Sequence, residues 1–358
     1  YKGGENNRHV MLSRYNPTTG IVKTITFGHQ HNGYLNISHI GESHNTIALG
    51  ISPLDGTIHL LYDLHAYSKK KPLNGSLAND YFRYSYSKKN VATISDDQFT
   101  LDQFVKDSDG DYKHLNMRDD TDYQSLTYPN FFLNEKDELF MWIRQGGSSN
   151  GAYKFCKYDG NNWSTFTQFN VLNASLNPDI DYNWGLYGDI KFVNKKMRIG
   201  FHRRSANPID DYSLNNGFHY AYSDDPNGLT QWKNHLNKSF TLPLLDSDKI
   251  KISEPGNMLG VSGKNTVRIS AVPDWTVTKR EDIHMVTTVG TGSDKVHVHT
   301  YRKASDSIFT TSTNFPGGNL YTYKNDVYLI GLENGYIFIE KADGLSLIHI
   351  SEPTRLGM

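Results

Sequence analysis

Two histidines in the first part of the chain are spaced so that they could share one catalytic edge. His44 comes just before an apolar run at 46–51, and His65 comes just after a second apolar run at 58–64. The Pro-Leu-Asp-Gly segment at 53–56 separates the runs and is typical of a turn. Because the outer ends of an antiparallel hairpin meet at one edge, we expect His44 and His65 to lie at the same rim of a sheet.

The same arrangement recurs twice further along the chain. A second hairpin is predicted at 127–144 and a third at 186–204. Each again has polar or titratable side chains where its first strand opens and its second strand closes. These side chains are Tyr128 and Arg144 in the second hairpin, and Tyr187, Arg203 and Arg204 in the third. If the hairpins are neighbouring units of one fold, their ends line one surface.

Histidine, tyrosine and arginine in one groove suit a β-elimination on a uronic-acid polymer. The proton beside the uronate carboxylate is only weakly acidic, so a cation must neutralise that carboxylate, which arginine does bidentately. A base must remove the proton and an acid must protonate the leaving glycosidic oxygen. Histidine suits either task near neutral pH, and tyrosine does so where a nearby cation lowers its pKa.

The composition favours a single large all-β fold. The 358 residues include 13% aromatics and 30 glycines, and no long segment has apolar residues at helical spacing. Repeats of roughly 45 to 65 residues, each with three or four short strands, predict a β-propeller. A β-sandwich or a β-helix is the alternative, and the long period and hairpin-like turns disfavour the helix.

The net charge and the cysteine count argue against several kinds of binding partner and against an internal disulfide. The net charge of −1 provides no global field that would attract nucleic acid, and no apolar run is long enough to cross a membrane. Cys156 is the only cysteine, so an internal disulfide is excluded. We interpret it as a packed thiol. We also interpret His59, in the middle of a predicted strand, as a structural histidine.

One segment resembles a degenerate Asp-box. The sequence GFHYAYSDDPNGLTQW at 217–232 has the Ser-x-Asp spacing of such a box and its terminal Trp232, with extra residues between them. The purpose of this motif is structural. Its aspartate fixes a turn and its tryptophan packs between sheets.

Together, three segments resemble the BNR-repeat polysaccharide lyases, and among these the β-propeller ulvan lyases. They are GESHNTIALGISPLDGTIHLLYDLHAY, TYPNFFLNEKDELFMWIRQGGS and the Asp-box segment, and the similarity covers roughly residues 8–344. The resemblance implies a seven-bladed propeller whose first and last blades are incomplete in this chain. It implies cleavage of ulvan between a sulfated rhamnose and a uronic acid, which leaves an unsaturated uronate at the new end.

The resemblance also implies roles for individual residues. His44 and His65 match active-site histidines, Tyr128 matches a catalytic tyrosine, and Arg144 matches the arginine that neutralises the carboxylate. Tyr128 and His65 are then the acid and base candidates, with their order left open. Tyr187, Arg203 and Arg204 are assigned to substrate binding.

The predicted chemistry requires no cofactor, but some lyases of this type carry a structural zinc. His202 ends one predicted strand and His219 begins the next, so the two could be neighbours across strands, with Cys156 or His235 completing a zinc site. Two histidines without a Cys-x-x-Cys pattern are weak evidence for such a site.

The remaining expectations concern domains, partners and location. We expect residues 1–344 to form one catalytic propeller domain. The segment LSLIHISEPTR at 345–355 resembles translated sequencing-adapter DNA, so we treat 345–358 as a non-native tail. The expected partner is an anionic sulfated polysaccharide, bound by a monomer that is secreted, periplasmic or on the cell surface.

Two other functions remain open for such a propeller. A sialidase-type glycoside hydrolase would need an arginine triad and an acidic catalyst, and the predicted rim has histidines in place of paired carboxylates. A carbohydrate-binding propeller without catalysis would have little use for titratable side chains.

Overall fold

The computed structural model describes ten segments of the chain. They are residues 9–30, 46–62, 83–106, 125–206, 215–254, 268–291, 294–313, 316–333, 335–342 and 354–356. Within them, the chain forms β-strands joined by turns, and no α-helix occurs in these segments. Four short 3₁₀ helices are present in them: η3 (Val91–Thr93), η4 (Leu101–Gln103), η6 (Ala174–Leu176) and η7 (Ser247–Ile250). In the same segments, no helix has the length and hydrophobicity needed to span a lipid bilayer.

The residues group into two compact units, each with its own sheets. The first unit comprises Tyr1–Gly147 and Tyr153–Gln168, and the second comprises Ser148–Ala152 and Phe169–Met358. The prediction of a single domain over residues 1–344 stays a prediction.

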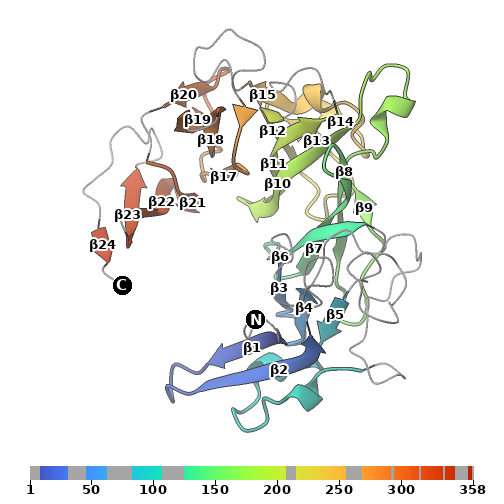
Figure 1. Ribbon diagram of the computed structural model, residues 1–358, viewed down its shortest axis with the longest axis vertical. Helices are drawn as coiled ribbons and strands as arrows, with labels where there is room; N and C mark the ends of the chain where they lie inside the picture. Colours follow the sequence, from blue (N-terminus) through green and yellow to red (C-terminus); the bar gives the residue numbers. More distant parts are fainter. Residues whose placement is uncertain are drawn as a thin grey trace. The chain divides into compact units, whose positions relative to one another are not determined.

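Three sheets hold the strands of the first unit, shown in blue to green in Figure 1. The first sheet contains β1 (His9–Tyr15) and β2 (Val22–Gln30). The second contains β3 (Ala48–Ile51), β4 (Ile58–Tyr62) and β5 (Arg83–Tyr86). The third contains β6 (Leu126–Leu133), β7 (Leu139–Gly147), β8 (Asn150–Lys157) and β9 (Thr167–Gln168), and the start of β8 belongs to the second unit.

The core of the first unit lies between successive sheets. One apolar cluster joins Leu61 of β4 to Met141 of β7 and includes the buried thiol of Cys156, as predicted. The strands β3 and β6, which open their sheets, lie against each other. A Cβ at Gly50 would come within 2.6 Å of the Phe131 ring, so this approach requires glycine.

His59 occupies this core as the predicted structural histidine. Its side chain on β4 is fully buried, and its Nδ1 is 2.6 Å from the hydroxyl of Tyr84. The edges and faces of Tyr158 and Trp163 surround the ring. Burial lowers the pKa of His59 to about 3, against a smaller opposing effect of the Asp55 carboxylate, so the imidazole is neutral at physiological pH.

The second unit also contains three sheets, coloured yellow-green to red in Figure 1. The first holds β10 (Trp184–Val193), β11 (Lys196–Ser205), β12 (Asn215–Ser223), β13 (Trp232–Asn234), β14 (Ser239–Phe240) and β15 (Lys251–Ser253). The next holds β16 (Arg268–Ile269), β17 (Asp274–Val277), β18 (Ile283–Thr291), β19 (Asp294–Arg302) and β20 (Thr310–Ser312). The last holds β21 (Asn319–Tyr323), β22 (Asp326–Glu333), β23 (Tyr336–Ala342) and β24 (Thr354–Leu356).

Asp274 links strands of all three sheets in the second unit. Its carboxylate accepts a hydrogen bond from Lys191 Nζ of β10 (2.5 Å) and another from the backbone N–H of Leu320 on β21 (2.7 Å). The strands β10, β17 and β21 therefore follow one another in space as they do in sequence. Sequential antiparallel sheets with neighbouring first strands are the arrangement of propeller blades, as predicted. The expected number of seven blades stays a prediction.

The degenerate Asp-box has the structural role expected of it. The Asp225 carboxylate accepts from the backbone N–H groups of Asn227 (2.9 Å), Leu229 (3.1 Å) and Thr230 (3.1 Å), and so fixes the turn before β13. The Trp232 side chain is buried. Its indole N–H donates to the carbonyl of Gly228 within the same turn (2.7 Å).

Candidate active site

The hairpin of β6 and β7 positions Tyr128 through a bulge. Thr127 pairs with Arg144 and Asn130 pairs with Trp142, so Tyr128 and Pro129 together oppose a single residue. Tyr128 has a φ of 52°. This left-handed conformation is unfavourable for a bulky side chain and persists only where the surrounding structure enforces it, as it does at many functional sites. The side chain of Tyr128 is half-buried.

Arg144 lies at the closing end of the same hairpin, as predicted, but its side chain is only 2% exposed. Its guanidinium donates to the carbonyls of Gly146 (3.1 Å) and Gly147 (2.5 Å). Two of its five donors therefore bind the last two residues of β7. The assignment of Arg144 to a substrate carboxylate stays a prediction, and here the group holds the end of its own strand.

The hairpin of β10 and β11 brings a second set of candidates together in the other unit. Its two-residue turn, Asn194 and Lys195, has positive φ at both positions, which matches the twist of the strands. Tyr187 pairs with His202 and Gly185 pairs with Arg204. Because side chains alternate along a strand and paired residues share a face, Tyr187, His202 and Arg204 lie on one face.

Within this set, the Tyr187 ring stacks on the imidazole of His202, with 5.5 Å between the ring centroids. His202 is 6% exposed, and burial lowers its pKa to about 3, with a further lowering by the Arg204 cation. The imidazole is therefore neutral, and it packs against the ring of Tyr187. The Nε atom of Arg204 is buried without a hydrogen-bond partner among the described residues.

Arg203 points to the opposite face from Arg204. Its guanidinium donates to Asn216 (3.1 Å), Ser247 (3.2 Å) and Asp248 (3.1 Å), and its side chain is buried. These bonds tie the η7 segment to the sheet. The two adjacent arginines, which the sequence could not separate, therefore have different surroundings, and Arg203 acts as a tie between segments.

The predicted zinc pair is wrong as a shared site. His202 pairs with Phe218 and His219 pairs with Phe201, so the two imidazoles lie on opposite faces of the sheet. His219 stacks on Phe201 with 4.9 Å between centroids. Burial, followed by nearby cations, lowers the pKa of His219 well below its usual value. Across the described segments, no group of three or more His, Cys, Asp or Glu residues could hold a metal. The described residues therefore do not form a zinc site, and the expectation of a structural zinc stays a prediction.

His44 and His65 lie outside the described residues. The hairpin that was expected to position them is present, with Ala48 paired to Leu61 and Ile51 paired to Ile58. The remaining candidates fall in different units, with Tyr128 and Arg144 in the first and Tyr187 and Arg204 in the second. The single cleft predicted for all of them therefore stays a prediction, whereas the pairing of opening and closing ends within each described hairpin is confirmed.

Comparisons with known proteins place the chain in a family. The model of the BNR repeat-containing family matches residues 4–314. The short isoform of ulvan lyase from Alteromonas sp. (strain LOR) is 45% identical in an alignment 366 positions long, gaps included, that covers 96% of this chain and 69% of that relative. The long isoform from Pseudoalteromonas sp. (strain PLSV) is also 45% identical, over 96% of this chain and 36% of that relative.

A solved structure gives the fold. The crystal structure of the polysaccharide lyase Uly1 superimposes with a TM-score of 0.90 at 43% identity, over 99% of this chain and 77% of that chain. The protein thus has an all-β propeller fold and belongs to the BNR repeat-containing family. It spans about a third of the length of the long ulvan lyases that it matches.

Proposed function

We propose that the protein is a polysaccharide lyase that cleaves ulvan by β-elimination. The observation that carries the proposal is the 45% identity to ulvan lyases along 96% of the chain. The likeness to a polysaccharide lyase structure supports it. The strained bulge at Tyr128, on the same hairpin as Arg144, adds local support, because costly backbone conformations persist at many functional sites.

The proposed reaction uses side chains of this chain. A base removes the proton at C5 of the uronate, the electron pair of that bond forms the C4–C5 double bond, and the bond from C4 to the glycosidic oxygen breaks. An acid then protonates the leaving oxygen. We assign the acid and base tasks to Tyr128 and His65. We assign neutralisation of the carboxylate to Arg144 together with His44, and sugar binding to Tyr187 and Arg204.

The proposal requires no cofactor, because a base, an acid and a cation are all supplied by side chains. It includes a secreted, periplasmic or surface location, since a polymer substrate is met outside the cell. It also includes action as a monomer.

Incubation with ulvan tests the function directly. We expect new ultraviolet absorbance from the conjugated uronate, and we expect Tyr128→Phe to lower turnover about 100-fold or more, the usual scale for a general acid or base. Tyr321→Phe, at an exposed tyrosine on β21, is the control and should leave turnover unchanged. New reducing ends without the absorbance would indicate a hydrolase, and binding without any cleavage would indicate a lectin-like propeller. A normal rate for Tyr128→Phe would remove this residue from the mechanism.

A further inference from the structure

A cavity of about 440 Å³ lies in the second unit, at the outer strands of the first sheet. Its walls come from the segment 234–240, which spans β13 and β14, and from the segment 248–251, which spans η7 and the start of β15. This volume is within the usual range for small-ligand sites. The candidate residues Tyr187 and Arg204 are on β10 and β11 and do not line it.

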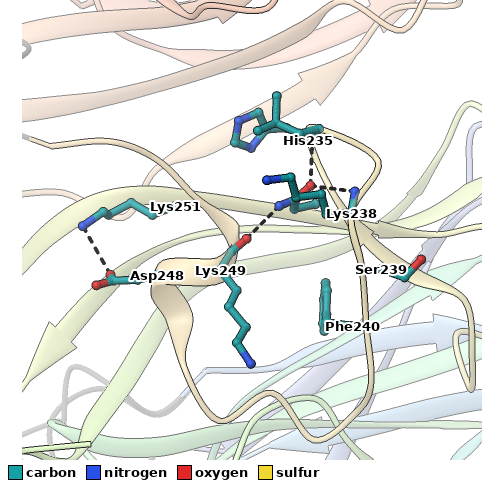
Figure 2. Close-up of a pocket in the computed structure, with 9 residues that line it drawn as sticks. His235, Lys238, Ser239, Phe240, Asp248, Lys249 and Lys251 are labelled. Carbon is teal, nitrogen blue, oxygen red and sulfur yellow. Dashed lines mark hydrogen bonds and ion pairs between the residues drawn. The ribbon is translucent and has the colours of Figure 1, made fainter. Parts of the chain in front are cut away.

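Asn234 holds the two walls together. Its side-chain amide donates to the carbonyl of Lys249 (2.8 Å), and its Oδ1 accepts from the backbone N–H groups of Leu236 (2.9 Å) and Lys238 (3.0 Å). Figure 2 draws the bond to the Lys249 carbonyl as a dashed line. Asn234 is 7% exposed, and both the nitrogen and the oxygen of its side-chain amide are hydrogen-bonded. These bonds hold the shape of the cavity before a ligand binds.

Positive charge dominates the lining. The lining contains three lysines and one carboxylate, that of Asp248. This carboxylate is already paired with Lys251 (3.3 Å) and Arg203 (3.1 Å). Lys238 and Lys249 are exposed, and neither makes an ion pair among the described residues. In Figure 2, Lys251 reaches toward Asp248, whereas Lys249 extends away from that pair. In a chain with a net charge of −1, this concave basic surface selects for anions locally.

The other lining groups suit a sugar. Phe240 is half-buried and packs its ring at 6.3 Å from Trp232 between centroids, so a rigid aromatic surface forms part of the wall. The face of such a ring carries negative charge and attracts the C–H face of a pyranose. His235 and Ser239 add polar atoms, and Nδ1 of His235 is buried without a hydrogen-bond partner among the described residues.

We propose that this cavity is a second saccharide-binding site that takes a sulfated sugar of an anionic polysaccharide, separate from the hairpin ends assigned to catalysis. The lining cations are lysines, which bind a tetrahedral oxyanion as point charges, and the lining has no arginine whose fork would match a planar carboxylate bidentately. We therefore assign the site to a sulfate ester. The proposal rests on the proposed function for the identity of the polymer, and it adds a second contact with that polymer.

The test measures binding and is independent of cleavage. Migration of the full chain is followed in native gels containing dextran sulfate, alginate or neutral dextran, which separate sulfate, carboxylate and sugar backbone as sources of affinity. The variant is Lys238→Gln with Lys249→Gln. The matched control is Lys279→Gln with Lys295→Gln, which removes the same charge from two exposed lysines outside the cavity.

We expect the cavity variant to bind dextran sulfate roughly 2- to 30-fold more weakly than the control, the range for losing two exposed ion pairs. Little change is expected with alginate or neutral dextran. Equal retention of the two variants on dextran sulfate would overturn the proposal. A loss on alginate as large as that on dextran sulfate would overturn the preference for sulfate. Full displacement by inorganic sulfate at matched ionic strength would overturn the role of the sugar ring.

The outcomes also separate this inference from the proposed function. If wild-type protein releases unsaturated uronate from ulvan but the two variants bind alike, the second site is wrong and the lyase stands. If the variants differ in binding but no unsaturated product is formed, the second site stands and the lyase is wrong.

Discussion

The hydroxyl of Tyr84 connects two buried polar groups in the first unit, and its removal should be costly. The indole N–H of Trp163 donates to this hydroxyl (3.0 Å), which is also hydrogen-bonded to Nδ1 of His59 (2.6 Å). Nε2 of His59 is buried and has no hydrogen-bond partner among the described residues. All three side chains are less than 9% exposed, so water cannot replace a lost bond.

Tyr84→Phe keeps the ring and its packing but leaves two buried polar atoms without partners. An unsatisfied buried donor or acceptor costs about 1–3 kcal/mol. For Trp163 Nε1 and His59 Nδ1 together, we expect a loss of about 2–6 kcal/mol in the free energy of unfolding. This is a large share of the roughly 5–15 kcal/mol that stabilises a typical domain.

Urea unfolding, followed by tryptophan fluorescence, measures this loss, with Tyr86→Phe as the matched control. Tyr86 stacks on Tyr84 (5.4 Å between centroids), but no hydrogen bond of its hydroxyl occurs among the described residues. We therefore expect Tyr86→Phe to change stability by less than about 0.5 kcal/mol. If Tyr84→Phe is no less stable than Tyr86→Phe, the buried network contributes nothing and the reasoning is refuted.

Three further predictions concern pH and two local networks. Among the described residues, six histidines have folded pKa values that burial lowers below 6.5: His59, His202, His219, His235, His284 and His299. Below about pH 6.5 the unfolded chain therefore binds more protons than the folded chain. The free energy of unfolding is then highest above about pH 6.5 and falls as the pH falls. At pH 5 the loss is about 2 kcal/mol for each histidine. A melting temperature that stays constant from about pH 7.5 to about pH 5 would contradict this. Glu281→Gln should lower the free energy of unfolding in urea by about 1–3 kcal/mol, since both carboxylate oxygens accept from buried Arg198 at 2.8 Å. If no loss is measured, the bonds of Arg198 to Val193 and Tyr220 suffice to hold the guanidinium. Asp225→Ala should cost about 1–3 kcal/mol by freeing the N–H groups of the Asp-box turn, and Asp225→Asn should recover part of that loss in the same assay.

The local patterns of the sequence were sufficient for the hairpins. The hairpins predicted at 127–144 and 186–204 are both present, as β6 with β7 and as β10 with β11. These features depend on residues close in sequence. The buried state of His59 and the role of the Asp-box were predicted for the same reason.

The candidate site was predicted less completely, because its geometry depends on register and bulges. Tyr128 and Arg144 were expected at one end of a hairpin, which is confirmed, but the left-handed backbone of Tyr128 and the carbonyl partners of Arg144 were not foreseen. His202 and His219 were predicted as neighbours, but a displacement of one residue in register is enough to place them on opposite faces.

The sequence by itself determined the all-β class, the hairpins and the kinds of side chain at their ends, since turn residues and apolar runs act over a few positions. Only the tertiary structure decided which side chains are buried, which share a face and where a cavity forms. The basic cavity shows why. Lys238 and Lys249 are ordinary surface lysines in the sequence, and both line one cavity because Asn234 ties a turn of one segment to the backbone of another.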